Sequence, residues 1–165
     1  MEWLLIGKLA LFIPILAYVT WTDLRKQIIP DPAILAGLAG ALVLAVAEGL
    51  YRQSWSPVWQ AFVSFAIAGF PLALVILVTR GGMGAGDMKL MALIGAVFAW
   101  RVALLTLFFG IVLAGFFAVV LVLAKKADRK MRIPLAPFLA AGWAAVMILH
   151  EPLARLLWVY YGVVL

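Results

Sequence analysis

The sequence contains no cysteine and only one histidine among its 165 residues. Without cysteine there is no disulfide, no thiolate nucleophile and no cysteine-ligated zinc site. His150 is followed by Glu-Pro-Leu-Ala, so the second histidine of a His-Glu-x-x-His zinc motif is missing. No serine stands in a Gly-x-Ser-x-Gly elbow; the candidates are Ser54, Ser56 and Ser64. The sequence therefore predicts no metal centre and no cofactor, and it argues against serine and cysteine hydrolases.

Charge is also scarce, because charged residues make up 12% of the chain and hydrophobic residues 68%, with a mean hydropathy of +1.18. Soluble domains carry about 25% charged residues, so a soluble fold is ruled out. Since a membrane helix needs about 20 apolar residues, the chain has room for roughly six or seven spans and for no separate soluble domain. We predict an all-α polytopic membrane protein in which residues 1–165 form one domain.

Six apolar runs predict about six transmembrane helices; they cover residues 9–21, 33–50, 58–79, 88–100, 102–124 and 134–149. A shorter run, 153–165, is either an interfacial helix or the end of a tilted sixth span. The N-terminus lacks a basic region, and no small-residue cleavage site follows the first run. We therefore expect a retained first span rather than a signal peptide.

Basic residues are distributed unevenly between the loops. Nine lie in the first, third and fifth loops, and two, Arg52 and Arg101, in the second and fourth. By the positive-inside rule, the odd-numbered loops face the cytoplasm and the N-terminus lies outside. The run 125–132 is best explained as a topology anchor, and anionic-lipid binding is its less favoured use. The net charge of +6 thus indicates topology, and we expect a lipid bilayer and no nucleic acid as partner.

Two aspartates, Asp23 and Asp87, lie where apolar spans meet the predicted cytoplasmic side. Lys8 and Arg101, expected at the opposite interface, each lie 14 or 15 residues from one of them, which is about 21 to 22 Å along a helix. Because the hydrocarbon core is about 30 Å thick, both carboxylates should lie inside its cytoplasmic edge at the same depth. Two carboxylates at one depth can meet, and an acid inside the membrane indicates a functional site.

The alternative for each aspartate is an ion pair at the membrane edge, Asp23 with Arg25 or Lys26 and Asp87 with Lys89. The glycine-rich segment before Asp87 favours a site, because four glycines occupy six positions; they are Gly81, Gly82, Gly84 and Gly86. Non-helical backbone at membrane depth is tolerated only against protein or a wet cavity, so we expect a water-accessible crevice beside Asp87. A simple flexible loop is the alternative, and the segment lacks the Gly-Lys-Ser/Thr ending of a phosphate-binding loop.

A pair of carboxylates can activate water without a metal or a nucleophile. Two acids that share a site do not easily both ionise, so one remains protonated while the other acts as a base. The base takes a proton from water as the water attacks a carbonyl, and the protonated partner stabilises the oxyanion and later protonates the leaving amine. Asp31, between Pro30 and Pro32, is expected to have a different role as the N-cap of a helix.

Three blocks of sequence resemble the type IV prepilin peptidases, which are aspartic proteases of the prokaryotic cytoplasmic membrane with a Gly-x-Gly-Asp motif. Residues 23–31 match the block with the first catalytic aspartate and Ile-Pro-Asp, residues 84–90 match Gly-x-Gly-Asp-x-Lys-Leu, and residues 133–139 match Pro-x-x-Pro-Phe. The resemblance implies six spans, catalytic Asp23 and Asp87 on the cytoplasmic side, and cleavage of prepilin-like leaders after a glycine. It assigns the remaining matched positions to the motif or to substrate approach: Gly84, Gly86, Lys89, Pro30, Asp31, Pro134 and Pro137.

Larger members of that family add a cysteine-rich N-methyltransferase domain, for which this chain has neither cysteine nor length. It therefore resembles the peptidase-only branch of tight-adherence pilus and archaeal flagellin systems. The resemblance implies a membrane-anchored prepilin-like substrate whose apolar helix lies against the spans, and we hypothesise that segment 81–86 lets the scissile strand approach. The oligomeric state stays open.

Three other functions remain as alternatives. A presenilin-like intramembrane protease shares Gly-x-Gly-Asp, but here Thr22 rather than tyrosine precedes Asp23 and no Pro-Ala-Leu segment is present. An ion-coupled transporter would use the two aspartates as ion sites, yet such proteins usually show paired repeats with two broken helices. A non-catalytic assembly factor would tolerate replacement of both aspartates.

Overall fold

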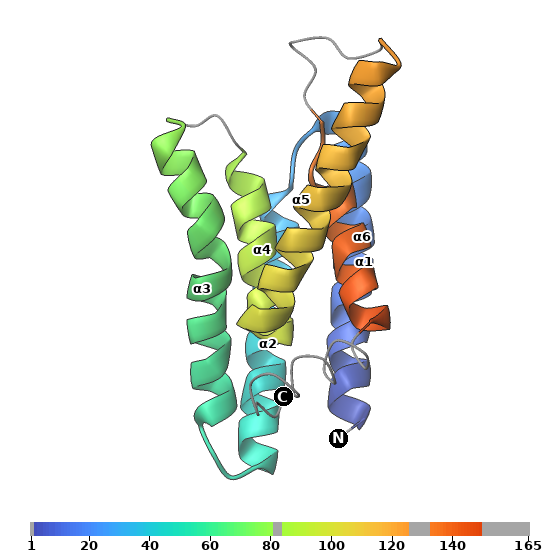
Figure 1. Ribbon diagram of the computed structural model, residues 1–165. Coiled ribbons are helices and arrows are strands. Elements are labelled where there is room, and N and C mark those ends of the chain that lie inside the picture. The colour runs from blue at the N-terminus through green and yellow to red at the C-terminus, as the bar shows by residue number, and fades with distance from the viewer. Residues whose placement is uncertain (1, 81–83, 126–132, 150–165) are drawn as a thin grey trace, which may run out of the picture.

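The computed structural model describes residues 2–80, 84–125 and 133–149, and this part of the chain is helical without a strand. Its helices alternate in direction along the bundle (Figure 1). They match the six predicted apolar runs and confirm an all-α fold; they are α1 (Glu2–Lys26), α2 (Asp31–Tyr51), α3 (Ser56–Val78), α4 (Ala85–Phe98), α5 (Trp100–Leu123) and α6 (Ala136–Ile148).

Some predictions fall on residues outside the described ranges, namely 81–83, 126–132 and 150–165. They include Gly81 and Gly82, most of the basic run 125–132, His150 and the last apolar run. The cytoplasmic orientation of the loops and the single domain over residues 1–165 stay predictions.

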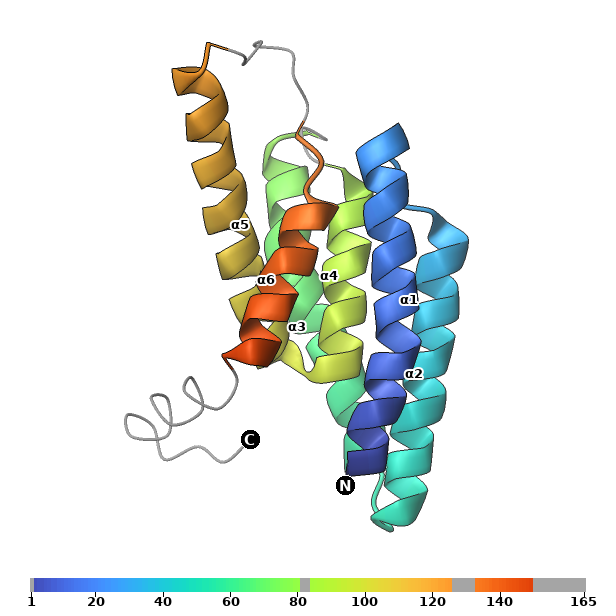
Figure 2. The same cartoon turned by 90° about the vertical axis from the view of Figure 1, so that its right-hand side faces the viewer.

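Helix length divides the bundle into two classes. Helices α1, α2, α3 and α5 contain 25, 21, 23 and 24 residues, and all four are long and apolar enough to cross a membrane. Helices α4 and α6 contain 14 and 13 residues, or about 21 and 20 Å, against a hydrocarbon core of about 30 Å. Both begin deeper in the bundle than α1 ends (Figure 2). The chain is therefore a polytopic membrane protein in which two of the described helices are short.

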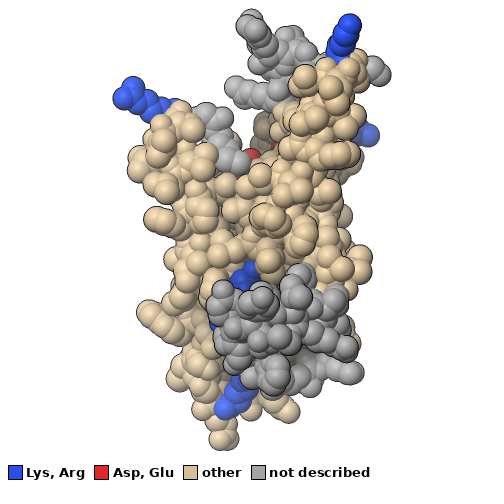
Figure 3. Space-filling view, viewed as in Figure 1, with Lys and Arg blue, Asp and Glu red and all other residues tan. Residues whose placement is uncertain are grey.

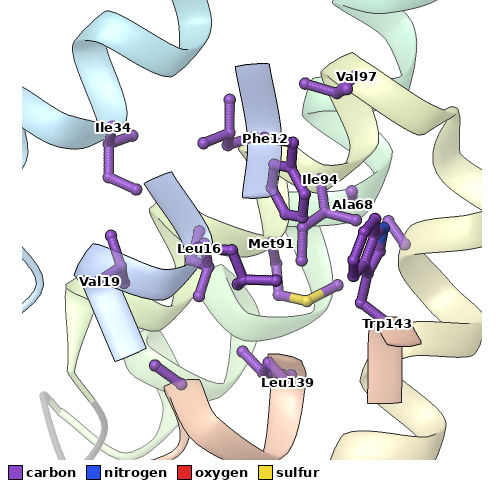
Figure 4. Close-up of a cluster of buried hydrophobic side chains, with 14 of the residues drawn as sticks. Phe12, Leu16, Val19, Ile34, Ala68, Met91, Ile94, Val97, Leu139 and Trp143 are labelled. Atoms are coloured by element: carbon purple, nitrogen blue, oxygen red, sulfur yellow. The ribbon is translucent and has the colours of Figure 1, made fainter. Parts of the chain in front are cut away.

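The core is built around the short helix α4, of which half the residues are buried. Met91 and Ile94 of α4 converge with Phe12 and Leu16 of α1 and with Trp143 of α6 (Figure 4). The ring centroids of Phe12 and Trp143 lie 5.0 Å apart. Because α4 is enclosed by its neighbours, its first turn has a fixed position relative to α1 and α6.

Helices α5 and α6 approach closely at small residues. A Cβ added at Gly142 of α6 would lie 2.7 Å from the carbonyl oxygen of Thr106 and 2.8 Å from the amide nitrogen of Gly110, both on the α5 backbone. Close backbone packing at small residues is typical of membrane helices. This contact sets the distance of α6 from α5 and hence the position of the start of α6.

Gly142→Ala is therefore expected to destabilise the protein by about 1–3 kcal/mol, the usual cost of overpacking, because backbone atoms of α5 cannot move aside as a side chain can. Gly115→Ala on α5 is the matched control, since a Cβ there meets nothing within 4 Å. Thermal unfolding of the two variants in detergent checks the prediction. Equal stability of both variants would contradict the close contact.

Candidate active site

Asp23 lies in the last turn of α1 and is 6% exposed. Its Oδ2 atom accepts a buried hydrogen bond of 3.0 Å from the backbone N–H of Ala136, the first residue of α6. The first N–H groups of a helix have no partner within it and attract negative charge. The start of α6 therefore supplies a donor to the Asp23 carboxylate and fixes its orientation.

The sequence around Ala136 explains why α6 begins there. Leu135 is the N-cap residue, and Pro137 occupies the first turn, where its missing N–H costs no helical hydrogen bond. Proline at positions 134 and 137 leaves only Leu135 and Ala136 as backbone donors between them. The Pro134 and Pro137 block thus starts a helix directly opposite Asp23.

Asp87 lies in the first turn of α4 and is half-buried. It is close enough to Asp23 for the two carboxylates to interact electrostatically. Gly84, the N-cap residue of α4, is exposed, and a Cβ at Gly84 would lie 3.6 Å from Oδ2 of Asp87. The structure therefore brings the two predicted aspartates together, and a glycine without a side chain lies beside the second one.

The membrane-edge ion pairs do not form between described residues. Neither Asp23 nor Asp87 has a salt bridge in the described part of the chain. The Arg25 guanidinium lies instead 5.0 Å from the ring centroid of Trp21. The Lys89 ammonium contacts Asp31 Oδ1 at 2.6 Å. Neither carboxylate is therefore neutralised by a described cation. The alternative in which Lys89 forms an ion pair with Asp87 is wrong, because Lys89 pairs with Asp31.

The Lys89–Asp31 ion pair joins the starts of α4 and α2, with side chains that are 39% and 61% exposed. Asp31 is the first residue of α2, and Pro30 is its N-cap, whose carbonyl oxygen accepts the Ala33 N–H at 3.1 Å. The prediction that Asp31 is the N-cap is wrong by one position, because the Pro30 backbone already has the extended conformation of a cap. Because the Asp31 side chain does not cap α2, its carboxylate is free to pair with Lys89.

The loop between α1 and α2 packs against Gly86. Gln27 follows α1 with a φ of 52°, and the chain then brings Ile29 against α4. A Cβ at Gly86 would lie 2.7 Å from Cβ of Ile29. The space at Gly86 is filled by Ile29, whereas Gly84 is exposed. The hypothesis that segment 81–86 lets the scissile strand approach stays a prediction.

The motif residues gather at one end of the bundle, where the surface is hollowed between the ends of α3 and α5. Acidic side chains are visible at the floor of this hollow (Figure 3). The acidic residues of the described ranges at this end are Asp23, Asp31 and Asp87. An opening with an acidic floor agrees with the crevice expected from the glycine-rich segment. Within the described ranges, no group of three or more His, Cys, Asp and Glu residues is arranged to hold a metal ion.

Residues 10–119 match the model of the type IV leader peptidase family. The chain belongs to this family. The matched stretch contains Asp23 and Asp87 and ends before α6.

Several curated relatives carry the name prepilin leader peptidase/N-methyltransferase. The protein from Stutzerimonas stutzeri is 34% identical over 76% of this chain and 44% of its own length. That from Bacillus subtilis is 31% identical over 79% and 51%, and that from Pseudomonas putida 34% identical over 81% and 49%. The chain therefore spans about half the length of the curated relatives it matches. No solved structure matches it.

The sequence did not predict two contacts at this site, the Ala136–Asp23 hydrogen bond and the Lys89–Asp31 ion pair. The Ala136 N–H is a backbone group, and the only sequence signal for it is the pair of prolines that starts a helix beside it. The Lys89–Asp31 pair joins residues 58 positions apart, and opposite charge on two motif residues was its only signal. Both contacts connect the motif blocks to each other.

Gly86→Ala is expected to lower the stability of the protein, by about 1–3 kcal/mol, because the new methyl group meets the branched Cβ of Ile29. Gly84→Ala should have a smaller effect, since its Cβ makes only an ordinary contact with Asp87. Thermal unfolding in detergent measures both. A larger loss for Gly84→Ala would contradict the packing of the α1–α2 loop on Gly86.

Reversal of the Lys89–Asp31 pair tests whether it holds α4 to α2. Lys89→Asp and Asp31→Lys each place two like charges together, and both should destabilise the protein. The double reversal should recover a coupling energy of about 0.2–1 kcal/mol, the usual value for an exposed ion pair. Urea unfolding at low salt gives the four stabilities. If the free energy of unfolding falls in the double variant by the sum of the two single losses, Lys89 and Asp31 do not stabilise each other.

Proposed function

We propose that this chain is an aspartic endopeptidase that removes the leader peptide from type IV prepilin-like precursors, with Asp23 and Asp87 as the catalytic pair. Membership of the leader peptidase family supports the reaction class. The observation that carries the assignment of residues is the convergence of two carboxylates from α1 and α4, neither of them paired with a described cation.

In the proposed mechanism the two carboxyl groups share one proton. The ionised group removes a proton from a water molecule as the water attacks the scissile carbonyl carbon. The protonated group donates a hydrogen bond to the developing oxyanion, and its proton then passes to the leaving amine. This hydrolysis needs only two acids and water.

The surrounding residues have positioning roles in this proposal. The Ala136 amide holds one oxygen of Asp23 at 3.0 Å, which leaves the other oxygen for water or for Asp87. The Lys89–Asp31 pair and the contact of Gly86 with Ile29 hold the first turn of α4 against the loop that follows α1. Exposed Gly84 leaves the approach to Asp87 open for an extended peptide.

The substrate assignment follows from charge and from the membrane. A basic leader is complementary to the acidic floor of the hollow, and the apolar segment after the cleavage site can lie against the lipid-facing helices. We place the site on the cytoplasmic side of a prokaryotic cytoplasmic membrane, from the distribution of basic residues between loops. The relatives' names combine a leader peptidase with an N-methyltransferase, and the proposal concerns the peptidase reaction alone.

Asp23→Asn and Asp87→Asn should each reduce cleavage of a candidate prepilin in membranes by about 10²–10⁴-fold, because each removes one acid–base group. Asp128→Asn is the matched control: the same change in the predicted cytoplasmic loop 125–132 should leave cleavage unaltered. Immunoblots must show equal amounts of every variant.

Retained cleavage in either aspartate variant would contradict the two-aspartate mechanism. That result would favour an ion-coupled transporter or an assembly factor.

A further inference from the structure

A cavity of about 120 Å³ lies at the end of the bundle opposite the aspartates. Residues of α1 to α4 line it, among them Lys8, Glu48, Gln60, Ser64, Ala96 and Phe98, and the cavity is open to one side. It exists because α4 ends at Phe98, whereas α2 and α3 continue toward this end of the molecule (Figure 1). The proposed peptidase reaction uses none of these residues.

The inner wall of the cavity carries polar groups among its apolar side chains. Ala96, Val97 and Phe98 line it and form the last turn of α4, where backbone carbonyls have no partner within the helix. Ser64 also lines it and is 3% exposed, and its hydroxyl forms no hydrogen bond with another described residue. Unpaired acceptors and a buried hydroxyl in such a place need a hydrogen-bonding occupant.

Lys8 and Glu48, which have opposite charges, line the cavity, and Arg52 pairs with Glu48 from outside the lining. The Glu48 carboxylate, with a side chain 12% exposed, lies 3.3 Å from the Lys8 ammonium and 2.8 Å from the Arg52 guanidinium. Each carboxylate oxygen has lone pairs for more than one donor. A cationic group can therefore bind between Glu48 and the carbonyls of α4, while an anionic group attached to it meets Lys8 and Arg52.

Aromatic residues place this cavity at the level of lipid headgroups. The ring centroids of Trp3 and Tyr51 lie 5.7 Å apart, and Trp55 and Trp59 are 70% and 71% exposed. Exposed tryptophan and tyrosine near helix ends mark a membrane interface. The occupant that is present at this level in every membrane is a phospholipid headgroup.

We propose that the cavity binds the headgroup of a phospholipid that carries a primary ammonium group. The ammonium supplies three N–H donors for Glu48, the α4 carbonyls and the Ser64 hydroxyl. The phosphate lies toward Lys8 and Arg52. A trimethylated headgroup has the same charges and no N–H donor, so the cavity distinguishes the two by hydrogen bonding.

The test uses the whole purified chain in micelles with equal amounts of phosphatidylethanolamine, phosphatidylcholine and phosphatidylglycerol. Native mass spectrometry counts the lipids that stay bound. Phosphatidylethanolamine should be retained roughly tenfold over the other two, the effect of one charge-assisted hydrogen bond. Water-soluble phosphoethanolamine at the same concentration should not displace it, which distinguishes a lipid from a free amine.

Glu48→Gln should abolish the preference for phosphatidylethanolamine. Asp128→Asn removes one carboxylate from the predicted cytoplasmic loop 125–132 and should preserve the preference. Equal retention of the three lipids by the wild-type chain overturns the proposal without any variant. Displacement by phosphoethanolamine overturns the lipid assignment. Neither result depends on whether the chain cleaves a prepilin.

Discussion

The arrangement of the acidic site depends on one buried hydrogen bond, from the Ala136 amide to the Asp23 carboxylate. A carboxylate that is almost fully buried between membrane helices needs a donor, since removal from water without a partner is costly. Here a helix start provides it, at a position where the N–H would otherwise lack a partner. The bond joins α1 to α6, residues 113 positions apart. It therefore couples the first and last described helices directly at the candidate catalytic group.

The second constraint is the shortness of α4 and α6. Because both begin inside the bundle, their first turns bring polar groups, the Asp87 carboxylate and the Ala136 amide, to the depth of Asp23 without a break in a long helix. At its other end, the early stop of α4 leaves the cavity beside Glu48 and Ser64. One short, enclosed helix thus produces an acidic site at one end and a cavity of mixed charge at the other. Close contacts fix its position, with Gly95 against the carbonyl oxygen of Ser64 and Gly86 against Ile29.

Much of this arrangement could be predicted from the sequence, because membrane thickness is a strong constraint. The spacing of Lys8 to Asp23 and of Asp87 to Arg101 placed both acids at one depth, and apolar run length located the six helices. The partners of the acids could not be predicted, because a backbone amide has the same chemistry at every residue and nothing marks Ala136 as a donor. Lys89 lies two positions from Asp87, which suggested the wrong pair. On a helix such residues point to different sides, and Lys89 instead reaches Asp31.

The central claim is that Asp23 and Asp87 lie together in the folded membrane protein. Since the chain has no cysteine, an introduced pair provides its only thiols. Asp23→Cys with Asp87→Cys, treated in native membranes with a short bifunctional thiol reagent, should give an intramolecular cross-link. Glu48→Cys with Asp87→Cys, at opposite ends of the bundle, should give none. The account is contradicted if the first pair does not cross-link while each of its cysteines reacts with a monofunctional reagent.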